Sequence, residues 1–402
     1  MGERELPAAS DWAKFWNLDP SIVFMNHGSF GACPAELLAS QQRLRDQMES
    51  EPVRFFVREL PILMDEARMA LAEFVGAETD SLALLPNATT GINAVLRSHP
   101  FEAGDEILII DHVYNAVRNA ADYVANRAGA HVRTVPIPFP IEDPETVVET
   151  VVGAVTPRTS LAILDHITSP TGLVMPMARL VSELRERGVE TLVDGAHVPG
   201  QLDLCLNELG AAYYVGNCHK WMCTPKGAAL LYVRPDRKQF VRPTAISHGA
   251  NMLTTRSSRY RLEFDWRGTV DPTPYLVIPD AIRFFAEKVP GGWSEMRRMN
   301  RALALQTRSI VASALGVDVP CPDSMVGFLA AVPLPDGVAK QPDSPLYTDP
   351  LQDKLLASYG IEVPIVPWPS PPKRLVRTSS QLYNSRSQAE YLAAVLTEVL
   401  DD

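Results

Sequence analysis

The sequence predicts an α/β fold in which helices cover both faces of a mostly parallel β-sheet. Between residues 81 and 200, short apolar runs alternate with longer segments of helical periodicity. This order is typical of parallel strands joined by crossover helices. The apolar runs are continuous rather than alternating, as expected for strands that are buried on both sides. The chain has 402 residues, 46% of them apolar, and is therefore long enough to bury a large core.

We expect strands at seven apolar runs, namely residues 81–85, 106–110, 132–135, 161–164, 189–193, 212–215 and 228–233. Helical periodicity predicts helices near 36–50, 61–75, 90–98, 114–128 and 176–187. The pattern weakens between 235 and 275, and helical periodicity returns from about 277 and again near 292–315. Proline-rich loops at 333–350 and 364–372 interrupt the last part. We therefore expect an N-terminal arm (1–20), a large α/β domain (21–275) and a small C-terminal α+β domain (276–402).

Composition excludes several classes of protein. The chain has 37 basic and 48 acidic residues, a net charge of −11, which argues against nucleic-acid binding. No apolar run approaches the roughly 18 residues of a membrane span, and the N-terminus has no secretory signal pattern. The five cysteines are odd in number and irregularly spaced, which argues against a disulfide framework. We expect a soluble, cytoplasmic protein without membrane or nucleic-acid partners.

Polar, small or titratable residues follow five of the predicted strands. These segments begin at Pro86, Asp111, Asp165, Asp194 and Gly216. Ligands of open parallel sheets bind beyond the carboxyl ends of the strands. The sequence therefore predicts that one edge of the sheet carries the active site.

Three features of this edge fit one cofactor. The turn NATTG (87–91) runs into a helix, whose N-terminus attracts an anion. Asp194 follows a buried strand and needs a cation or strong donor, and Lys220 lies between His219 and Trp221, where burial would make the amine nucleophilic. Taken alone, each has an ordinary interpretation: a helix cap, a structural aspartate, or a lysine that reaches solvent. Together they are what pyridoxal phosphate requires for its phosphate, ring nitrogen and Schiff base.

A metal site is the alternative interpretation of the histidines at positions 112, 166, 197 and 219. Zinc requires three or four ligands at suitable spacing. The segment from Cys218 to Cys223 includes His219 but has no second cysteine pair to complete such a site. We therefore expect no metal.

Ordered motifs along most of the chain carry a family resemblance. They are FMNHGSFGACP (24–34), EPVRFF (51–56), NATTGIN (87–93), DHVYNAV (111–117), TSPTG (168–172), VDGAHVPG (193–200), GNCHKW (216–221) and LVRTSSQLYN (375–384). The sequence resembles the class V aminotransferase superfamily of fold-type I pyridoxal phosphate enzymes. It most resembles the branch around isopenicillin N epimerase.

The resemblance implies roles for individual residues at the cofactor. Lys220 would form the Schiff base and carry the Cα proton, Asp194 would pair with the pyridine nitrogen, and His197 would lie near the phenolic oxygen. The remaining residues implied at the cofactor are Thr89, Thr90 and the Ala88 backbone at the phosphate, with Asn217 and His219 assisting. His112, or alternatively Tyr114, would stack on the ring.

The resemblance also implies contacts to the substrate and to a second subunit. Ser169 would face the substrate side of the cofactor, and Arg377 would bind the substrate α-carboxylate. Asn26 and His27 belong to an arm that would enter the substrate site, although a simple turn is the alternative. Gly268 and Thr269 match a segment that reaches the phosphate of the neighbouring subunit, which implies a homodimer with shared sites.

The implied reaction begins with labilisation of a bond at Cα of an amino acid substrate. Reprotonation on the opposite face gives epimerisation, which the nearest branch favours. Loss of a β-sulfur group gives C–S lysis of cysteine or a cysteine conjugate, and protonation at the cofactor gives transamination. The stretch 363–374 before Arg377 contains no cysteine, so the persulfide mechanism of cysteine desulfurases is not expected. A catalytically inactive binding subunit on the same scaffold is the non-enzyme alternative.

Overall fold

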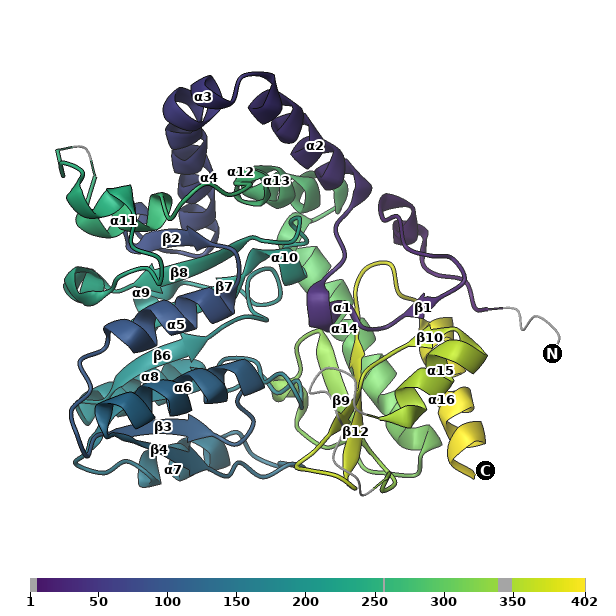
Figure 1. Cartoon of the computed structure of the whole chain (residues 1–402). Helices are drawn as coiled ribbons and strands as arrows, with labels where there is room; N and C mark the ends of the chain where they lie inside the picture. Colours follow the sequence, from purple (N-terminus) through teal and green to yellow (C-terminus); the bar gives the residue numbers. More distant parts are fainter. Residues whose placement is uncertain (1–5, 256, 339–348, 402) are drawn as a thin grey trace.

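A seven-stranded sheet forms the centre of the chain, as the computed structural model shows for residues 6–255, 257–338 and 349–401 (Figure 1). The strand order is β2-β8-β7-β6-β5-β3-β4. The strands are β2 (Leu82–Leu85), β3 (Glu106–Ile110), β4 (His131–Val135), β5 (Thr159–Asp165), β6 (Glu190–Asp194), β7 (Tyr213–Asn217) and β8 (Ala229–Val233). Only β8 pairs antiparallel with its neighbours. The predicted mostly parallel sheet is confirmed.

Helices cover both faces of this sheet (Figure 1). One face packs against α5 (Ala88–Ser98), α6 (Asn115–Ala128) and α11 (Arg259–Asp265). The other face packs against α4 (Leu60–Phe74), α7 (Glu145–Gly153), α8 (Met177–Glu186) and α13 (Ile278–Lys288). Neighbouring strand residues such as Leu108 and Ile109 belong to opposite faces, and both are fully buried. This double burial explains the continuous apolar runs in the sequence.

Further helices connect these layers. They are α1 (His27–Phe30), α2 (Ala35–Ser50), α3 (Pro52–Arg54) with a π-helical turn (Phe55–Glu59), α9 (Leu206–Leu209), α10 (Cys218–Trp221) and α12 (Thr273–Leu276). Single 3₁₀ turns occur at Asp11–Phe15, Thr79–Ser81, Pro235–Phe240, His248–Asn251 and Asp323–Met325. Within the described ranges, no helix has the length and hydropathy needed to cross a membrane.

The C-terminal third forms a smaller layer beside the large sheet (Figure 1). Its antiparallel strands β9 (Leu329–Leu334), β12 (Arg374–Ser379) and β11 (Ile365–Pro367) pack with α14 (Gly292–Ala314), α15 (Pro350–Tyr359) and α16 (Arg386–Asp401). Near the N-terminus, β1 (Val23–Phe24) pairs in parallel with β10 (Ile361–Glu362). The chain divisions at residues 20 and 275 stay predictions. Residues 1–5 of the expected arm and 339–348 of the proline-rich loop lie outside the described part.

Candidate active site

A cavity of about 420 Å³ lies at the carboxyl edge of the large sheet. The residues that line it follow five different strands and include Asn87, Tyr114, Asp165, Asp194 and Asn217. These are the strand ends at which the sequence predicted a site. A second cavity of about 460 Å³ adjoins it, since Ser29, Phe30, Tyr114, Ser169 and Lys220 line both. Each volume is within the range of small-molecule binding sites.

Lys220 lies on the short helix α10, directly after β7. Its Nζ is 3.1 Å from Nε2 of His197. Burial and, second, the nearby Arg377 guanidinium lower the pKa of Lys220 to about 7, while Asp194 opposes the shift. A lysine with this pKa is largely uncharged just above neutral pH and is therefore a nucleophile.

His197 is in a protonation state that can hydrogen-bond to the uncharged amine of Lys220. Burial holds the pKa of His197 well below its usual value, so the ring is neutral. The indole N–H of Trp221 donates to Nδ1 of His197 at 3.4 Å. The ring proton then belongs on Nε2, where it can donate to the lone pair of the Lys220 amine. His197 therefore orients the amine in its reactive form.

Contacts from α1 hold the backbone of Lys220 in place. His27 is fully buried, with Nε2 2.9 Å from the Lys220 carbonyl oxygen and Nδ1 2.9 Å from the Tyr383 hydroxyl. Gly31 has a φ of +73°, and a Cβ there would collide with the His219 carbonyl. The structure corrects the expectation for His27, which lines neither cavity and supports Lys220 from behind. Asn26 does line the second cavity, where its amide donates to Glu362 at 2.9 Å.

Asp194 ends β6 as a buried carboxylate in the first cavity. The Ala196 N–H donates to its Oδ1 at 2.9 Å, and burial raises its pKa. Asp165 ends the neighbouring strand β5 and lines the same cavity. Asp165 follows a predicted strand, but its pairing with Asp194 could not be predicted from the sequence, because the pairing depends on strand register.

The N-terminus of α5 forms one wall of the first cavity through Asn87, Ala88 and Thr89. Asn87 caps the helix by accepting the N–H of Thr90 at 2.9 Å. Asn217 Oδ1 accepts the Ala88 N–H at 2.9 Å, which fixes this helix to the end of β7. Together with His219, which also lines the cavity, this wall has the polarity of an anion site. Thr90 does not line the cavity; its contacts are to the Asn87 cap.

Arg377 extends from β12 into the second cavity as a buried cation. Its guanidinium donates to the carbonyl and hydroxyl of Ser169 and to the Ser29 hydroxyl, the last at 3.1 Å. Its Nε has no hydrogen-bond partner, and burial lowers its pKa to about 10. Among the residues that the structure describes, no acidic side chain neutralises it. A buried, unneutralised guanidinium is suited to a carboxylate ligand.

His112 and Tyr114 were alternatives for the ring that stacks on the cofactor. His112 is fully buried outside both cavities, with Nδ1 2.7 Å from the Thr171 hydroxyl and Nε2 2.9 Å from the Ile137 carbonyl. Its ring lies against Trp368, with 4.1 Å between centroids. Tyr114 lines both cavities. The first choice of His112 is therefore replaced by Tyr114.

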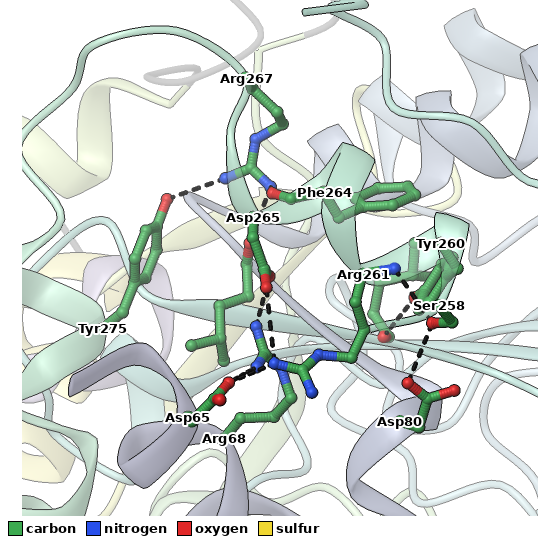
Figure 2. Close-up of polar contacts among 12 residues, drawn as sticks. Asp65, Arg68, Asp80, Ser258, Tyr260, Arg261, Phe264, Asp265, Arg267 and Tyr275 are labelled. Atoms are coloured by element: carbon green, nitrogen blue, oxygen red, sulfur yellow. Dashed lines mark hydrogen bonds and ion pairs between the residues drawn. The ribbon is translucent and has the colours of Figure 1, made fainter. Parts of the chain in front are cut away.

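Gly268 and Thr269 lie away from this cavity, after α11. An ion-pair cluster around the buried Arg68 anchors α11 to α4 (Figure 2): Arg68 pairs with Asp65 and Asp265, and Arg261 also pairs with Asp65. Arg267 then donates to the Leu84 carbonyl at 2.9 Å and the Tyr275 hydroxyl at 3.3 Å. The cluster thereby fixes the start of the loop. Contact of this loop with a second subunit stays a prediction.

The histidines do not gather around a common point. His166 Nδ1 is 3.0 Å from the Tyr214 hydroxyl, and His219 Nδ1 is 2.9 Å from the Ala228 carbonyl. In the part of the chain that the structure describes, no three His, Cys, Asp or Glu side chains form a group that could hold a metal.

Comparison with known proteins gives consistent matches. The family model "Aminotransferase class-V" matches residues 36–324. The chain is 33% identical to isopenicillin N epimerase of Streptomyces clavuligerus, over 97% of this chain and 98% of that protein. It is 29% identical to a putative L-cysteine desulfhydrase of Oryza sativa subsp. japonica, over 97% and 87% of the two chains. The solved structure of the cystine C–S lyase C-DES with cysteine persulfide shares the fold, with a TM-score of 0.77 at 22% identity over 94% and 97% of the chains.

Proposed function

This chain belongs to the class-V aminotransferase family of pyridoxal-phosphate-dependent enzymes, and on that premise we propose that it inverts Cα of an amino acid group with a large side chain. This is the reaction class that the name isopenicillin N epimerase describes. The size of the second cavity carries the proposal.

The residues of the first cavity fit the cofactor. The α5 N-terminus would hold the phosphate, Asp194 would pair with the ring nitrogen, and Lys220 would hold the aldehyde carbon. Each of these groups suits its partner: the dipole of a helix N-terminus favours an anion, a buried carboxylate favours a cation, and an uncharged amine reacts with an electrophile. When bound, the cofactor withdraws electrons from Cα and weakens the bonds there.

The chain's own residues supply binding and proton transfer. Arg377 binds the α-carboxylate of the substrate and thereby fixes Cα between the two cavities. Lys220 takes the Cα proton in its uncharged form, which its pKa of about 7 makes available. We propose that Tyr114 donates its own hydroxyl proton to Cα on the other face, because it lines both cavities. Exchange with solvent then removes the proton from Lys220 and returns one to Tyr114. His166 is another side chain near this edge that could donate a proton, but it is hydrogen-bonded to Tyr214 and lines neither cavity.

The second cavity favours a substrate larger than cysteine. Its volume is about 460 Å³, and its walls include Phe30, Val113, Val366, Pro367 and Trp368. Lys220 and Arg377 are the cationic side chains in its lining, and both have roles at Cα. A cysteine side chain is one methylene and one thiol and would leave most of this space empty. The cavity therefore supports a bulky, largely uncharged substituent.

C–S β-lysis is the second candidate, because relatives named L-cysteine desulfhydrase also align with nearly the whole chain. The same Lys220 and Asp194 would serve that reaction and also transamination. The loop before Arg377 contains no cysteine, so a persulfide-forming step on this loop is not proposed. The family match and the presence of Lys220, Asp194 and Arg377 oppose a purely binding subunit.

One screen separates these reactions. The yellow protein would be incubated with amino acids of increasing side-chain size in deuterated water. Exchange and inversion at Cα without pyruvate or sulfide would support the proposal, with bulky uncharged substrates preferred. Release of pyruvate with sulfide or a thiol would show that the protein is a lyase. Dependence of turnover on a keto acid would show that it is a transaminase. Borohydride should attach the cofactor covalently to the wild type and bleach its yellow colour, and Lys220→Ala should lose every reaction.

A further inference from the structure

Asp165 and Asp194 form a pair of acids at the edge of the sheet. β5 and β6 are adjacent parallel strands, and Asp165 and Asp194 are partners in their register. Both end their strands and line the first cavity. They are only 2% and 5% exposed, respectively. Two carboxyl groups therefore lie side by side in a region that solvent scarcely reaches.

The two acids differ in how well neighbouring groups stabilise their negative charge. Asp194 accepts the Ala196 N–H and is attracted by Lys220. The backbone N–H of Tyr114 faces Asp165, but Asp165 Oδ2 is buried without a hydrogen-bond partner, and within the described chain no cationic side chain offsets it. Burial and, second, the charge of Asp194 raise the pKa of Asp165 well above its usual value. Neighbouring buried carboxyl groups cannot both ionise readily.

We propose that Asp165 is a neutral carboxylic acid in the working enzyme and donates its O–H to the Asp194 carboxylate, so that the two acids share one proton. This proposal rests on the proposed function in one respect, which is that Asp194 faces the ring nitrogen of the cofactor. Asp165 is then a positioning residue that acts through Asp194. The hydrogen bond from Asp165 reduces the negative charge on Asp194, so Asp194 binds the ring-nitrogen proton less strongly. Asp165 thereby moderates the electron withdrawal that the cofactor supplies.

The surroundings identify Asp194 as the group that sets the protonation of Asp165. Among the described residues, the other titratable or charged groups near the pair are His166 directly after β5, His197 after β6, Tyr214 on β7, His219 and Lys220 on α10, and Asp111, His112 and Tyr114 after β3. His166 is engaged by Tyr214, and His112 by Thr171 and Ile137. Asp111 accepts the Ile137 N–H at 2.9 Å. Lys220 acts on Asp194 rather than on Asp165.

The first test is infrared spectroscopy of the holoenzyme at neutral pH. Wild type should show the carbonyl band of a buried protonated carboxylic acid, and Asp165→Asn should lose it. Asp111→Asn is the matched control, because Asp111 directly follows the neighbouring strand β3 but is partly exposed and hydrogen-bonded; this variant should keep the band. Absence of the band in wild type would overturn the proposal, whether or not the protein binds the cofactor.

The second test is a pH titration of the colour of the bound cofactor. Asparagine keeps a neutral donor at position 165, so Asp165→Asn should leave the midpoint nearly unchanged. Asp165→Leu removes the donor and makes Asp194 more basic, so the midpoint should rise by about one pH unit, a tenfold change. If Asp165 is ionised instead, Asp165→Asn removes a negative charge and the midpoint falls. If the leucine variant does not fold, the infrared band and the asparagine titration still decide the question. A protein without cofactor colour would contradict the proposed function and leave the infrared result intact.

Discussion

At the scale of single residues, the proposed chemistry depends on keeping a few polar groups in their less common ionic state. Lys220 is a lysine that loses its charge near neutral pH, and the neutral His197 beside it can donate to the free amine. Arg377 is the opposite case, since it keeps its charge but has no acidic partner among the described residues. Binding of a ligand with the matching chemistry would stabilise both the uncharged amine and the unneutralised cation.

The pKa of Lys220 predicts how the apoprotein takes up pyridoxal phosphate. Only the uncharged amine attacks the aldehyde, so the rate should rise with pH through about 7 and level off above it. A lysine with the usual pKa would give a rate still rising near pH 10. Stopped-flow absorbance across this range measures the midpoint. A rate that keeps increasing through pH 9 would show that Lys220 is charged at neutral pH.

Arg377→Lys tests the carboxylate contact. Lysine keeps the positive charge but lacks the planar pair of donors, so KM should rise about tenfold to a hundredfold, equivalent to about 1.5–3 kcal/mol of binding, with a smaller effect on kcat. Arg374→Lys is the matched control on the same strand, because Arg374 pairs with Asp349 instead of facing the cavity. An unchanged KM in Arg377→Lys would place the carboxylate elsewhere.

At the scale of elements, two helices are fixed by buried polar contacts that have no direct part in chemistry. His27 on α1 holds the carbonyl of Lys220, and Arg68 on α4 holds Asp265 on α11. The Arg68 side chain is completely buried, whereas Asp265 is partly exposed. Such a cation is tolerated only while its carboxylates are present.

The α4–α11 contact can be tested by unfolding. Arg68→Leu should lower the free energy of unfolding by about 3 kcal/mol, because Asp265 is left without its buried partner. Replacing Asp265 as well should recover part of the loss, since the double variant no longer buries an unpaired charge. Chemical denaturation of the wild type, the two single variants and the double variant gives the coupling energy between Arg68 and Asp265. Additive losses would mean that the ion pair does not join the two helices.

Sequence periodicity predicted the elements better than it predicted contacts. All seven strands of the large sheet occur at predicted strands. Six of them are buried on both faces and leave continuous apolar runs, whereas β4 is largely exposed and its sequence HVRTV is not such a run. Helix α7 was not predicted, since its sequence ETVVETVVG is rich in valine, which favours strands. His112 was misplaced because position after a strand does not show which way a side chain points. The pairing of Asp165 with Asp194 was invisible for a similar reason, since it depends on strand register.

At the scale of the whole molecule, the site draws on segments far apart in sequence. Ser29 from α1, Ser169 after β5 and Arg377 from β12 are joined by hydrogen bonds. The small sheet therefore holds Arg377, the proposed carboxylate-binding group, in the cavity that adjoins the edge of the large sheet. The loop with Gly268 and Thr269 lies outside this cavity, although the family resemblance assigns it to a cofactor phosphate. A homodimer with shared sites resolves this difference, because the loop would then serve the partner subunit.

Mixed dimers test the shared site. Lys220→Ala and a variant whose loop is blocked by Thr269→Trp should each be nearly inactive. If each site takes Lys220 from one subunit and the loop from the other, a mixed dimer contains one intact site and one that is doubly defective. Equal mixing after dissociation should then restore about a quarter of wild-type activity, because about half of the dimers are mixed and each has one working site. Sedimentation should give twice the 44.2 kDa chain mass. A mixture that stays inactive while mixed dimers form would place Lys220 and the loop in the same subunit's site.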